Sequence, residues 1–380
     1  MKKTTGGLAA LMLTAAPALA GGIERAPQSL AVLFEPGNYV ELSFGGADPT
    51  VSGRDRAGFN TGDVAQGYGF VGLGYKQQIN ENLSAGLIIE QPFGADVRYP
   101  SQPNPLAPNP AVDGSVLLGG TFANVNSTTV TALARYKLDN NISFHGGIRA
   151  SRADAEVGLS GAAYGNPITA GGLSGYNVRM DPAWGAGYVI GAAYEIPEIA
   201  GRVSLTYNSK VTHEFDTREN INPGAVTTTS VDTPRSVTLE GQTGVAADTL
   251  VFGSIRWVKW SEVLVEPAAF TTATGGGLVA LEDTTTYTLG VGRRFTDNWS
   301  GSVSFVYEPK GDDLVSPLAP TNGRRGITLA AVYTMDNFKV TTGINYSKLG
   351  SANPQTAGQP RADMEDNDLW GIGIRVGYSF

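Results

Sequence analysis

The sequence predicts an all-β fold, a transmembrane antiparallel β-barrel of about 14 strands with a short N-terminal plug segment. Segments of about ten residues repeatedly alternate apolar with small or polar side chains, as tilted strands that cross a bilayer do. Short polar connections alternate with long connections rich in Gly, Pro, Thr and Asp. No stretch approaches the roughly 18 apolar residues of a spanning helix, so a membrane protein of this composition has to be a closed barrel.

The composition agrees with this fold class and excludes several functions. Gly contributes 50 of 380 residues, and charged residues contribute 16%, which is below the quarter or so that is usual in soluble proteins. The net charge of -8 argues against nucleic acid as a partner. The chain has no Cys, which excludes disulfides, thiolate metal sites and a Cys nucleophile. We expect no cofactor and no metal.

The N-terminal residues have the features of a secretory signal peptide. A basic start, Met1–Lys3, precedes a short apolar core and the small-residue end Ala18-Leu19-Ala20, the pattern that signal peptidase recognises. We therefore predict a signal peptide over residues 1–20. A short hatch-like segment is predicted over 21–37 and the barrel over 38–380.

Each predicted strand has an apolar residue at every second position, because side chains of a strand point alternately to two faces. In chain order they lie near residues 40–44, 66–77, 83–89, 130–138, 142–148, 184–194, 203–207, 237–239, 251–257, 287–295, 299–307, 327–333, 338–346 and 369–380. The last one is the clearest. Its even positions from Trp370 to Phe380 are all apolar with aromatic residues at both ends, while its odd positions are small or polar.

The connections provide an independent test of the barrel. Asn and Asp, which tolerate turn geometry, dominate the short connections at 77–82, 139–141, 296–298 and 335–337. Long connections include residues 92–125, 158–182 and 214–233. Short periplasmic turns and long extracellular loops are typical of outer-membrane barrels. Both chain ends fall on the side of the short turns, so we expect both termini in the periplasm of a Gram-negative cell.

The face assignment supplies candidate binding residues. His145, Arg149, Arg256, Lys339 and Arg375 are expected to point into the lumen. Arg149 and Arg256 lie near mid-height, and a desolvated Arg can hold a carboxylate through two hydrogen bonds. The alternative, which is favoured for any single Arg, is pairing with lumen acids such as Glu90, Glu240 or Glu308.

Apolar side chains on the lumen face are the second group of candidates. Leu133, Val258, Trp260 and Val306 are expected to line a path for a hydrophobic molecule.

Catalysis is not expected. The chain has two His residues, His145 and His213, and a Ser–His site needs the two groups within hydrogen-bond reach. Ser143 shares a face with His145 but lies roughly 7 Å away along a strand. His213 is expected at a solvated strand edge.

Several stretches together resemble the FadL-type family of outer-membrane transporters for long-chain fatty acids and aromatic hydrocarbons. They are residues 128–144, the run Trp257-Val258-Lys259-Trp260-Ser261, residues 287–299 and the terminal Gly377-Tyr378-Ser379-Phe380. The resemblance implies a fourteen-stranded barrel with an N-terminal hatch, passive uptake of hydrophobic molecules, and a kink in the third strand that opens sideways to the membrane. Pro92, Phe93 and Gly94 match that kink.

This chain departs from the family pattern in two ways. Only residues 21–37 precede the first strand, and Gln28-Ser29-Leu30 stands where the family's hatch has an Asn-Pro-Ala turn. The basic residues that bind a fatty-acid carboxylate in other members have no equivalents that the sequence identifies.

The sequence therefore predicts a channel for hydrophobic compounds, with long-chain fatty acids favoured and the lateral exit at the third strand. Its expected partners are hydrophobic small molecules, outer-membrane lipid and lipopolysaccharide. A general diffusion porin and a structural or adhesin-like surface barrel are the alternatives.

Overall fold

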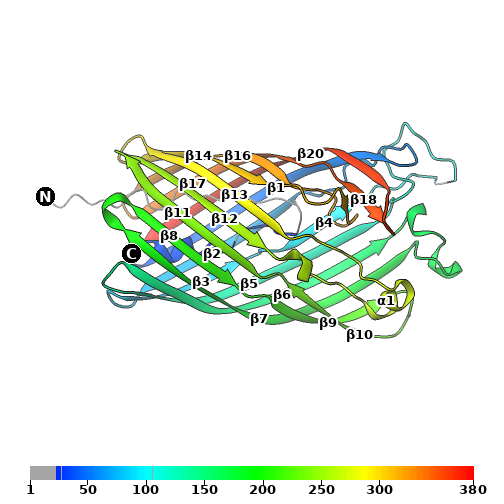
Figure 1. Ribbon diagram of the computed structural model, residues 1–380, viewed down its shortest axis with the longest axis horizontal. Coiled ribbons are helices and arrows are strands. Elements are labelled where there is room, and N and C mark those ends of the chain that lie inside the picture. Colours follow the sequence, from blue (N-terminus) through cyan, green and yellow to red (C-terminus); the bar gives the residue numbers. More distant parts are fainter. Residues whose placement is uncertain (1–22, 27, 105) are drawn as a thin grey trace.

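The computed structural model describes residues 23–26, 28–104 and 106–380, so the predicted signal peptide lies outside the described residues. The chain forms a closed antiparallel barrel of 14 strands, which confirms the predicted fold class (Figure 1). The barrel closes where β1 (Tyr39–Asp55) pairs with β20 (Ala362–Ser379) along their whole length, from Tyr39 opposite Ser379 to Asp55 opposite Ala362.

Each predicted strand segment has a counterpart in the wall, in the predicted order. The remaining continuous strands are β2 (Tyr68–Gln78), β5 (Phe122–Lys137), β6 (Ile142–Leu159), β7 (Tyr176–Ile196), β12 (Thr249–Val258), β13 (Thr284–Arg294), β14 (Trp299–Glu308), β16 (Arg324–Met335) and β17 (Phe338–Leu349). Three wall strands are built from two pieces: β3 (Leu83–Glu90) with β4 (Gly94–Arg98), β8 (Gly201–Asn208) with β9 (Val211–Glu219), and β10 (Thr227–Thr233) with β11 (Ser236–Ala246).

The outer surface carries the apolar belt that a bilayer requires. Ile148, in the middle of β6, is 72% exposed. Large aromatic side chains are exposed on both sides of this aliphatic zone: Tyr136, Phe144, Tyr194, Phe295, Trp299, Phe338 and Phe380 near the short turns, and Trp184, Tyr287, Tyr307 and Trp370 toward the long loops. Aromatic girdles flanking an apolar band are typical of transmembrane barrels.

The short turns contain the expected residue types. Asn141, Asp248 and Asp336 have positive φ values of 68°, 56° and 50°, a region that Asn and Asp tolerate better than most residues. Because Tyr39 pairs with Ser379, the start of the first strand and the end of the last lie at this same end of the barrel.

The predicted long loops are shorter than expected, because several strands continue beyond the apolar belt. Residues 214–233 were predicted as a loop, but β9 and β10 occupy most of them. In β9 the alternation is inverted: Val211 and Phe215 are buried, while Glu214 and Asp216 face outward. Outside the bilayer the outer face of a strand meets water and carries polar side chains. In the sequence, such a strand resembles a polar loop.

The N-terminal segment lies inside the barrel near the short turns. Its 3-10 helix η1 (Ala31–Phe34) places Val32 and Leu33 in an apolar cluster with Leu133 of β5 and Val189 of β7. The Phe34 ring is contacted by two guanidinium groups, Arg135 at 4.6 Å and Arg202 at 4.2 Å from its centroid. These contacts fix the segment to the inner wall through packing and cation–π attraction.

An ion pair fixes the end of this segment. Lys339 Nζ lies 2.5 Å from a carboxylate oxygen of Glu35. Lys76 Nζ also donates hydrogen bonds to the backbone oxygens of Glu35 and Gly37, at 2.6 and 3.2 Å.

The long loops carry the remaining elements at the opposite end (Figure 1). These are η2 (Ala162–Tyr164), η3 (Ile168–Ala170), η5 (Trp260–Glu262), α1 (Ala268–Thr274), β15 (Leu314–Val315), β18 (Asn353–Thr356) and β19 (Gln359–Pro360), with η4 (Pro197–Ile199) in a short turn. Among the described residues, no helix is long and apolar enough to cross a membrane.

Candidate functional site

The wall is interrupted at the position predicted for the kink. β3 ends at Glu90 and β4 begins at Gly94, and both pair with β5. Glu90 lies opposite Thr129 and Gly94 opposite Asn126, so four steps along one strand face three along the other. This one-residue excess is a β-bulge, which bends a strand and disrupts its ladder.

At the bulge, the side chain of Ser127 on β5 makes the hydrogen bonds that the interrupted strand ladder lacks. Its hydroxyl accepts a hydrogen bond from Phe93 N at 3.0 Å and donates one to Phe93 O at 2.6 Å. The backbone of Phe93 is buried together with its side chain, and unpaired backbone groups in such a place are costly. The Ser127 side chain therefore stabilises the interruption.

Pairing between β2 and β3 stops on the short-turn side of the bulge. The last opposed residues are Leu73 and Ile89, although β2 continues to Tyr68. Farther toward the loops the wall is joined again, where Gln66 N donates to Asp96 O at 3.0 Å. Between these points Val71 N donates to the Gln91 side chain at 3.3 Å.

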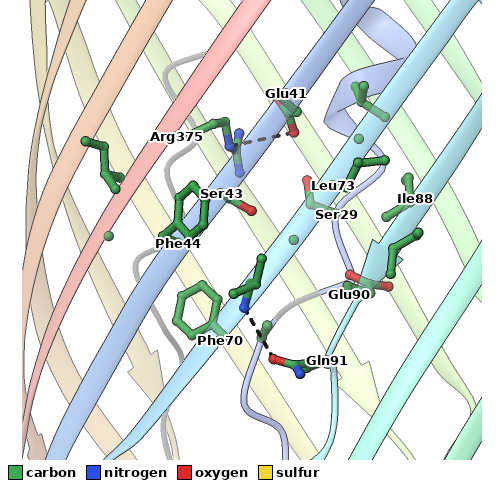
Figure 2. Close-up of a pocket in the computed structure, with 18 residues that line it drawn as sticks. Ser29, Glu41, Ser43, Phe44, Phe70, Leu73, Ile88, Glu90, Gln91 and Arg375 are labelled. Atoms are coloured by element: carbon green, nitrogen blue, oxygen red, sulfur yellow. Dashed lines mark hydrogen bonds and ion pairs between the residues drawn. The ribbon is translucent and has the colours of Figure 1, made fainter.

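A cavity of about 80 Å³ lies at this interruption and is called the wall cavity (Figure 2). Its lining includes Glu90 and Ser43, which face the lumen, and Phe44 and Val71, which face the lipid with exposures of 45% and 53%. Residues of both wall faces therefore line one cavity. Opposite Gly45 the ring of Phe70 passes so close that a Cβ on Gly45 would lie 2.2 Å from it.

The N-terminal segment contacts the bulge directly. Glu24 forms an isolated antiparallel bridge with Phe93. Arg25 N donates to Pro92 O at 2.8 Å, and Gly94 N donates to Ile23 O at 2.8 Å. A Cβ on Gly94 would lie 2.5 Å from the Arg25 guanidinium group, so the Arg25 side chain passes directly over Gly94.

The two arginines predicted as carboxylate ligands lie in the lumen and are buried. Arg256 is held by Glu24, with Nη2–Oε1 and Nε–Oε2 distances of 2.5 and 3.3 Å, and it also donates to Thr238 at 2.9 Å. Arg256 therefore pairs with a lumen acid, as the alternative expected, but the N-terminal segment supplies that acid in place of Glu90, Glu240 or Glu308.

Arg149 has a different environment from Arg256. Its Nη1 donates to Asn208 at 3.3 Å. Glu90, Glu24 and Arg256 all act on it electrostatically, so the two arginines and two glutamates form one interacting group. We call these four residues the charged band.

A second cavity of about 100 Å³, the lumen cavity, lies inside the barrel toward the loops. Phe93, Ala95, Met180 and Phe215 are among its mostly apolar lining. Phe93 therefore links the bulge to this cavity.

The predicted apolar path residues occupy three places. Val258 and Trp260 belong to one buried cluster with Phe93, and the Phe93 and Trp260 rings meet edge to face at 5.9 Å. Leu133 also points inward, but it packs against the N-terminal segment in a separate cluster. Val306 is half-buried on the lumen face of β14.

The expectation that His213 is solvated was wrong. His213 is 1% exposed, bonds to Ser151 O at 3.1 Å and lines the lumen cavity. The strand beyond the apolar belt was not recognised, so the inward direction of this side chain was missed.

A third cavity of about 710 Å³, the outer cavity, lies among the long loops. Its lining comes from residues 159–173, 264–282, 314–322 and 355–357. Sequence reasoning missed it, because irregular loops carry no periodic signal.

The two groups considered for catalysis have separate partners. Ser143 accepts a hydrogen bond from Arg135 Nε at 3.1 Å. His145 Nε2 lies 3.0 Å from Thr206 Oγ1.

These features define an outer-membrane β-barrel whose lumen holds an N-terminal segment and whose wall is interrupted beside it. The chain belongs to the family of outer membrane transport proteins described as OMPP1/FadL/TodX, whose model matches residues 18–380. No curated protein sequence matches the chain.

Solved structures share the fold at low sequence identity. A FadL homologue of Pseudomonas aeruginosa has a TM-score of 0.69 at 15% identity, covering 92% of both chains. The toluene transporter TodX of P. putida has a TM-score of 0.60 at 15% identity, covering 92% of both chains. The toluene transporter TbuX of Ralstonia pickettii has a TM-score of 0.61 at 14% identity, covering 99% of both chains.

Proposed function

We propose that this protein is a passive channel that takes hydrophobic compounds from the cell exterior and releases them sideways into the outer membrane. The observation that carries the proposal is the wall cavity, which is lined by lumen-facing Glu90 and Ser43 together with lipid-facing Phe44 and Val71. A hydrophobic molecule that leaves through this interruption reaches the lipid-facing surface of the wall without passing the rest of the lumen. The family and the two toluene transporters of the same fold support this class of substrate.

The charged band favours a lateral exit over a straight path to the periplasm. Its four charged side chains, Glu24, Glu90, Arg149 and Arg256, lie in the lumen beside Phe93. Beyond them the N-terminal segment packs Val32, Leu33 and Phe34 against the inner wall. Pulling an apolar molecule through a charged, hydrogen-bonded group gives it no compensating contacts, whereas the wall cavity also offers apolar contacts with Phe44, Phe70 and Val71.

Trp260 and Val258 support Phe93 at the junction of lumen cavity and bulge, and in this proposal they shape the path. For a fatty acid, Arg256 is the proposed carboxylate ligand, with Arg149 behind it. Since the Glu24 carboxylate is bound to Arg256, the carboxylate of a fatty acid has to displace it. An uncharged hydrocarbon has no such requirement.

The orientation in the membrane follows the loop lengths. We place the short turns and both termini in the periplasm and the long loops outside the cell, where they meet lipopolysaccharide. The outer cavity then faces the medium and serves as the entrance.

Uptake by whole cells tests this function. Cells that lack hydrophobic-compound channels and express this chain should accumulate radiolabelled naphthalene and oleate faster than cells with an empty vector. Purified protein should show little steady ion conductance in planar bilayers. Equal uptake in both strains, or a large steady conductance of the general-porin kind, would contradict the proposal.

A further inference from the structure

Six apolar residues line both the outer cavity and the lumen cavity, and they separate the two. They come from two long loops and are Val265, Leu278, Val279, Leu281, Leu318 and Ala319. We call these six residues the septum. Because each of them lines both spaces, their side chains lie on the boundary between the two cavities.

The septum is held at its edges. In the first loop, Leu278 N donates to Val265 O at 2.8 Å, which joins the two arms of that loop. Helix α1 lies between these arms, and its first turn donates to the buried carboxylate of Glu219, from Ala269 N at 2.8 Å and Phe270 N at 2.7 Å. Tyr176 also donates to Glu219 at 2.9 Å.

The far end of the same loop has its own attachment. Trp260 Nε1 donates to Thr284 at 3.1 Å, and Ser261 N donates to Asp283 at 3.0 Å. In the second loop, Leu318 N and Ala319 N bond back to Ser316 at 3.2 and 3.0 Å. At the border of the two loops, Asp312 N donates to Glu282 at 2.8 Å.

The backbone of the septum is therefore hydrogen-bonded, while its side chains are held together by apolar contact. Leu278 and Leu318 are buried at 9% and 6% exposure in one cluster with Phe215 and Met180 of the inner wall. Separating apolar surfaces in water costs about 25 cal/mol per Å². An apolar solute that slides between them replaces the lost contacts, whereas water, an ion or a sugar does not.

We infer that the septum is the selectivity element of the channel, with Leu278, Leu281 and Leu318 as its specificity-determining residues. It opens for apolar solutes because they substitute for its own contacts, and it stays closed to ions and polar solutes. The inference rests on the proposed function, because it names the element that admits only the proposed class of substrate. Glu219 is a positioning residue that fixes the helical end of the first loop.

The test compares two double variants of the full-length protein. Leu278→Ala with Leu318→Ala shortens the septum. Leu264→Ala with Leu314→Ala is the matched control, because these leucines line the outer cavity only and are 53% and 43% exposed. Leu281→Gln is a third variant that places an amide at a half-buried position and changes the core less. Heat-modifiable mobility in gels verifies that each barrel is folded.

The readouts are KCl conductance in planar bilayers, arabinose permeation in liposome swelling, and naphthalene uptake by cells. We expect both septum variants to raise conductance and arabinose permeation several-fold over wild type, with naphthalene uptake retained. The control should match wild type. Septum variants with the conductance and arabinose permeation of the control would overturn the inference, and so would an equal rise in the control.

This experiment distinguishes a failure of the septum inference from a failure of the proposed function. Conductance and arabinose permeation are measured without any hydrophobic solute, so they test the septum inference alone. Naphthalene uptake by wild-type cells at the level of the empty vector would contradict the proposed function.

Discussion

Glu24 of the N-terminal segment holds Arg256 of β12 through two contacts, from Oε1 to Nη2 at 2.5 Å and from Oε2 to Nε at 3.3 Å. The same residue forms a backbone bridge with Phe93 at the interrupted wall strand. One residue thus neutralises a buried lumen cation and contacts the bulge. Two-point Arg–carboxylate pairs are among the stronger polar contacts in proteins.

Glu24→Gln should weaken this link. The neutral amide removes the carboxylate that contacts Arg256 directly, so we expect tighter binding of oleate and faster hydrogen exchange at residues 92–94. Isothermal titration with oleate in detergent and exchange mass spectrometry measure the two effects. Glu195→Gln is the control, because Glu195 pairs with Arg135 and neither residue lines the wall cavity. Oleate binding that stays at the wild-type level would refute the role of Arg256 as carboxylate ligand.

Ser127→Ala should destabilise the bulge. The variant leaves Phe93 N and Phe93 O without the Ser127 hydroxyl, and an unsatisfied buried group costs about 1–3 kcal/mol. We expect a lower free energy of unfolding in urea and faster exchange at residues 91–95. Ser304→Ala on the lumen face of β14 is the matched control. An unchanged exchange pattern would show that other groups hold the bulge.

Trp260→Ala should affect both stability and uptake. Trp260 is 2% exposed and packs on Phe93, and removing a buried Trp typically costs about 3–5 kcal/mol. Trp260→Phe keeps an aromatic contact and should retain most naphthalene uptake, whereas Trp260→Ala should lose it. Trp184→Ala, on the lipid-facing surface at 62% exposure, is the control. Uptake that is the same in all three variants would exclude Trp260 from the path.

Glu219→Gln should loosen helix α1. An acid at the first turn of a helix satisfies free backbone N–H groups, and losing such a cap costs about 0.5–2 kcal/mol. We therefore expect faster hydrogen exchange over residues 264–281. Glu214→Gln, exposed on the same strand, should behave like wild type. If the two variants exchange alike, Glu219 does not position this loop.

The barrel could be predicted because a bilayer imposes one requirement on every strand. Trp370, Ile372 and Ile374 of β20 all face lipid, and this repeats at period two around the wall. Where β9 leaves the bilayer, Val211 and Phe215 are buried instead and the outer face is polar. There the outward side chains are polar because they meet water, which is the opposite of the pattern inside the bilayer. The sequence analysis therefore missed the strand extensions and the inward direction of His213.

The candidate site was only partly predictable. The Pro92–Gly94 interruption was found through resemblance, and Phe93, Val258 and Trp260 do cluster. The Glu24–Arg256 pair joins residues 232 positions apart, and no local pattern signals such a contact. The outer cavity and the septum depend on the conformations of irregular loops, which residue alternation does not encode.

The one-residue excess at the bulge permits a direct test of lateral exit. Deleting Pro92, which has no N–H to offer to a ladder, equalises the spacing between β3–β4 and β5 and restores inward and outward alternation from Glu90 onward. The barrel should fold and keep its heat-modifiable mobility. The decisive measurement is the rate of radiolabelled naphthalene uptake by cells expressing this deletion. The account predicts uptake at the level of cells without the channel, and wild-type uptake through the continuous wall would contradict it.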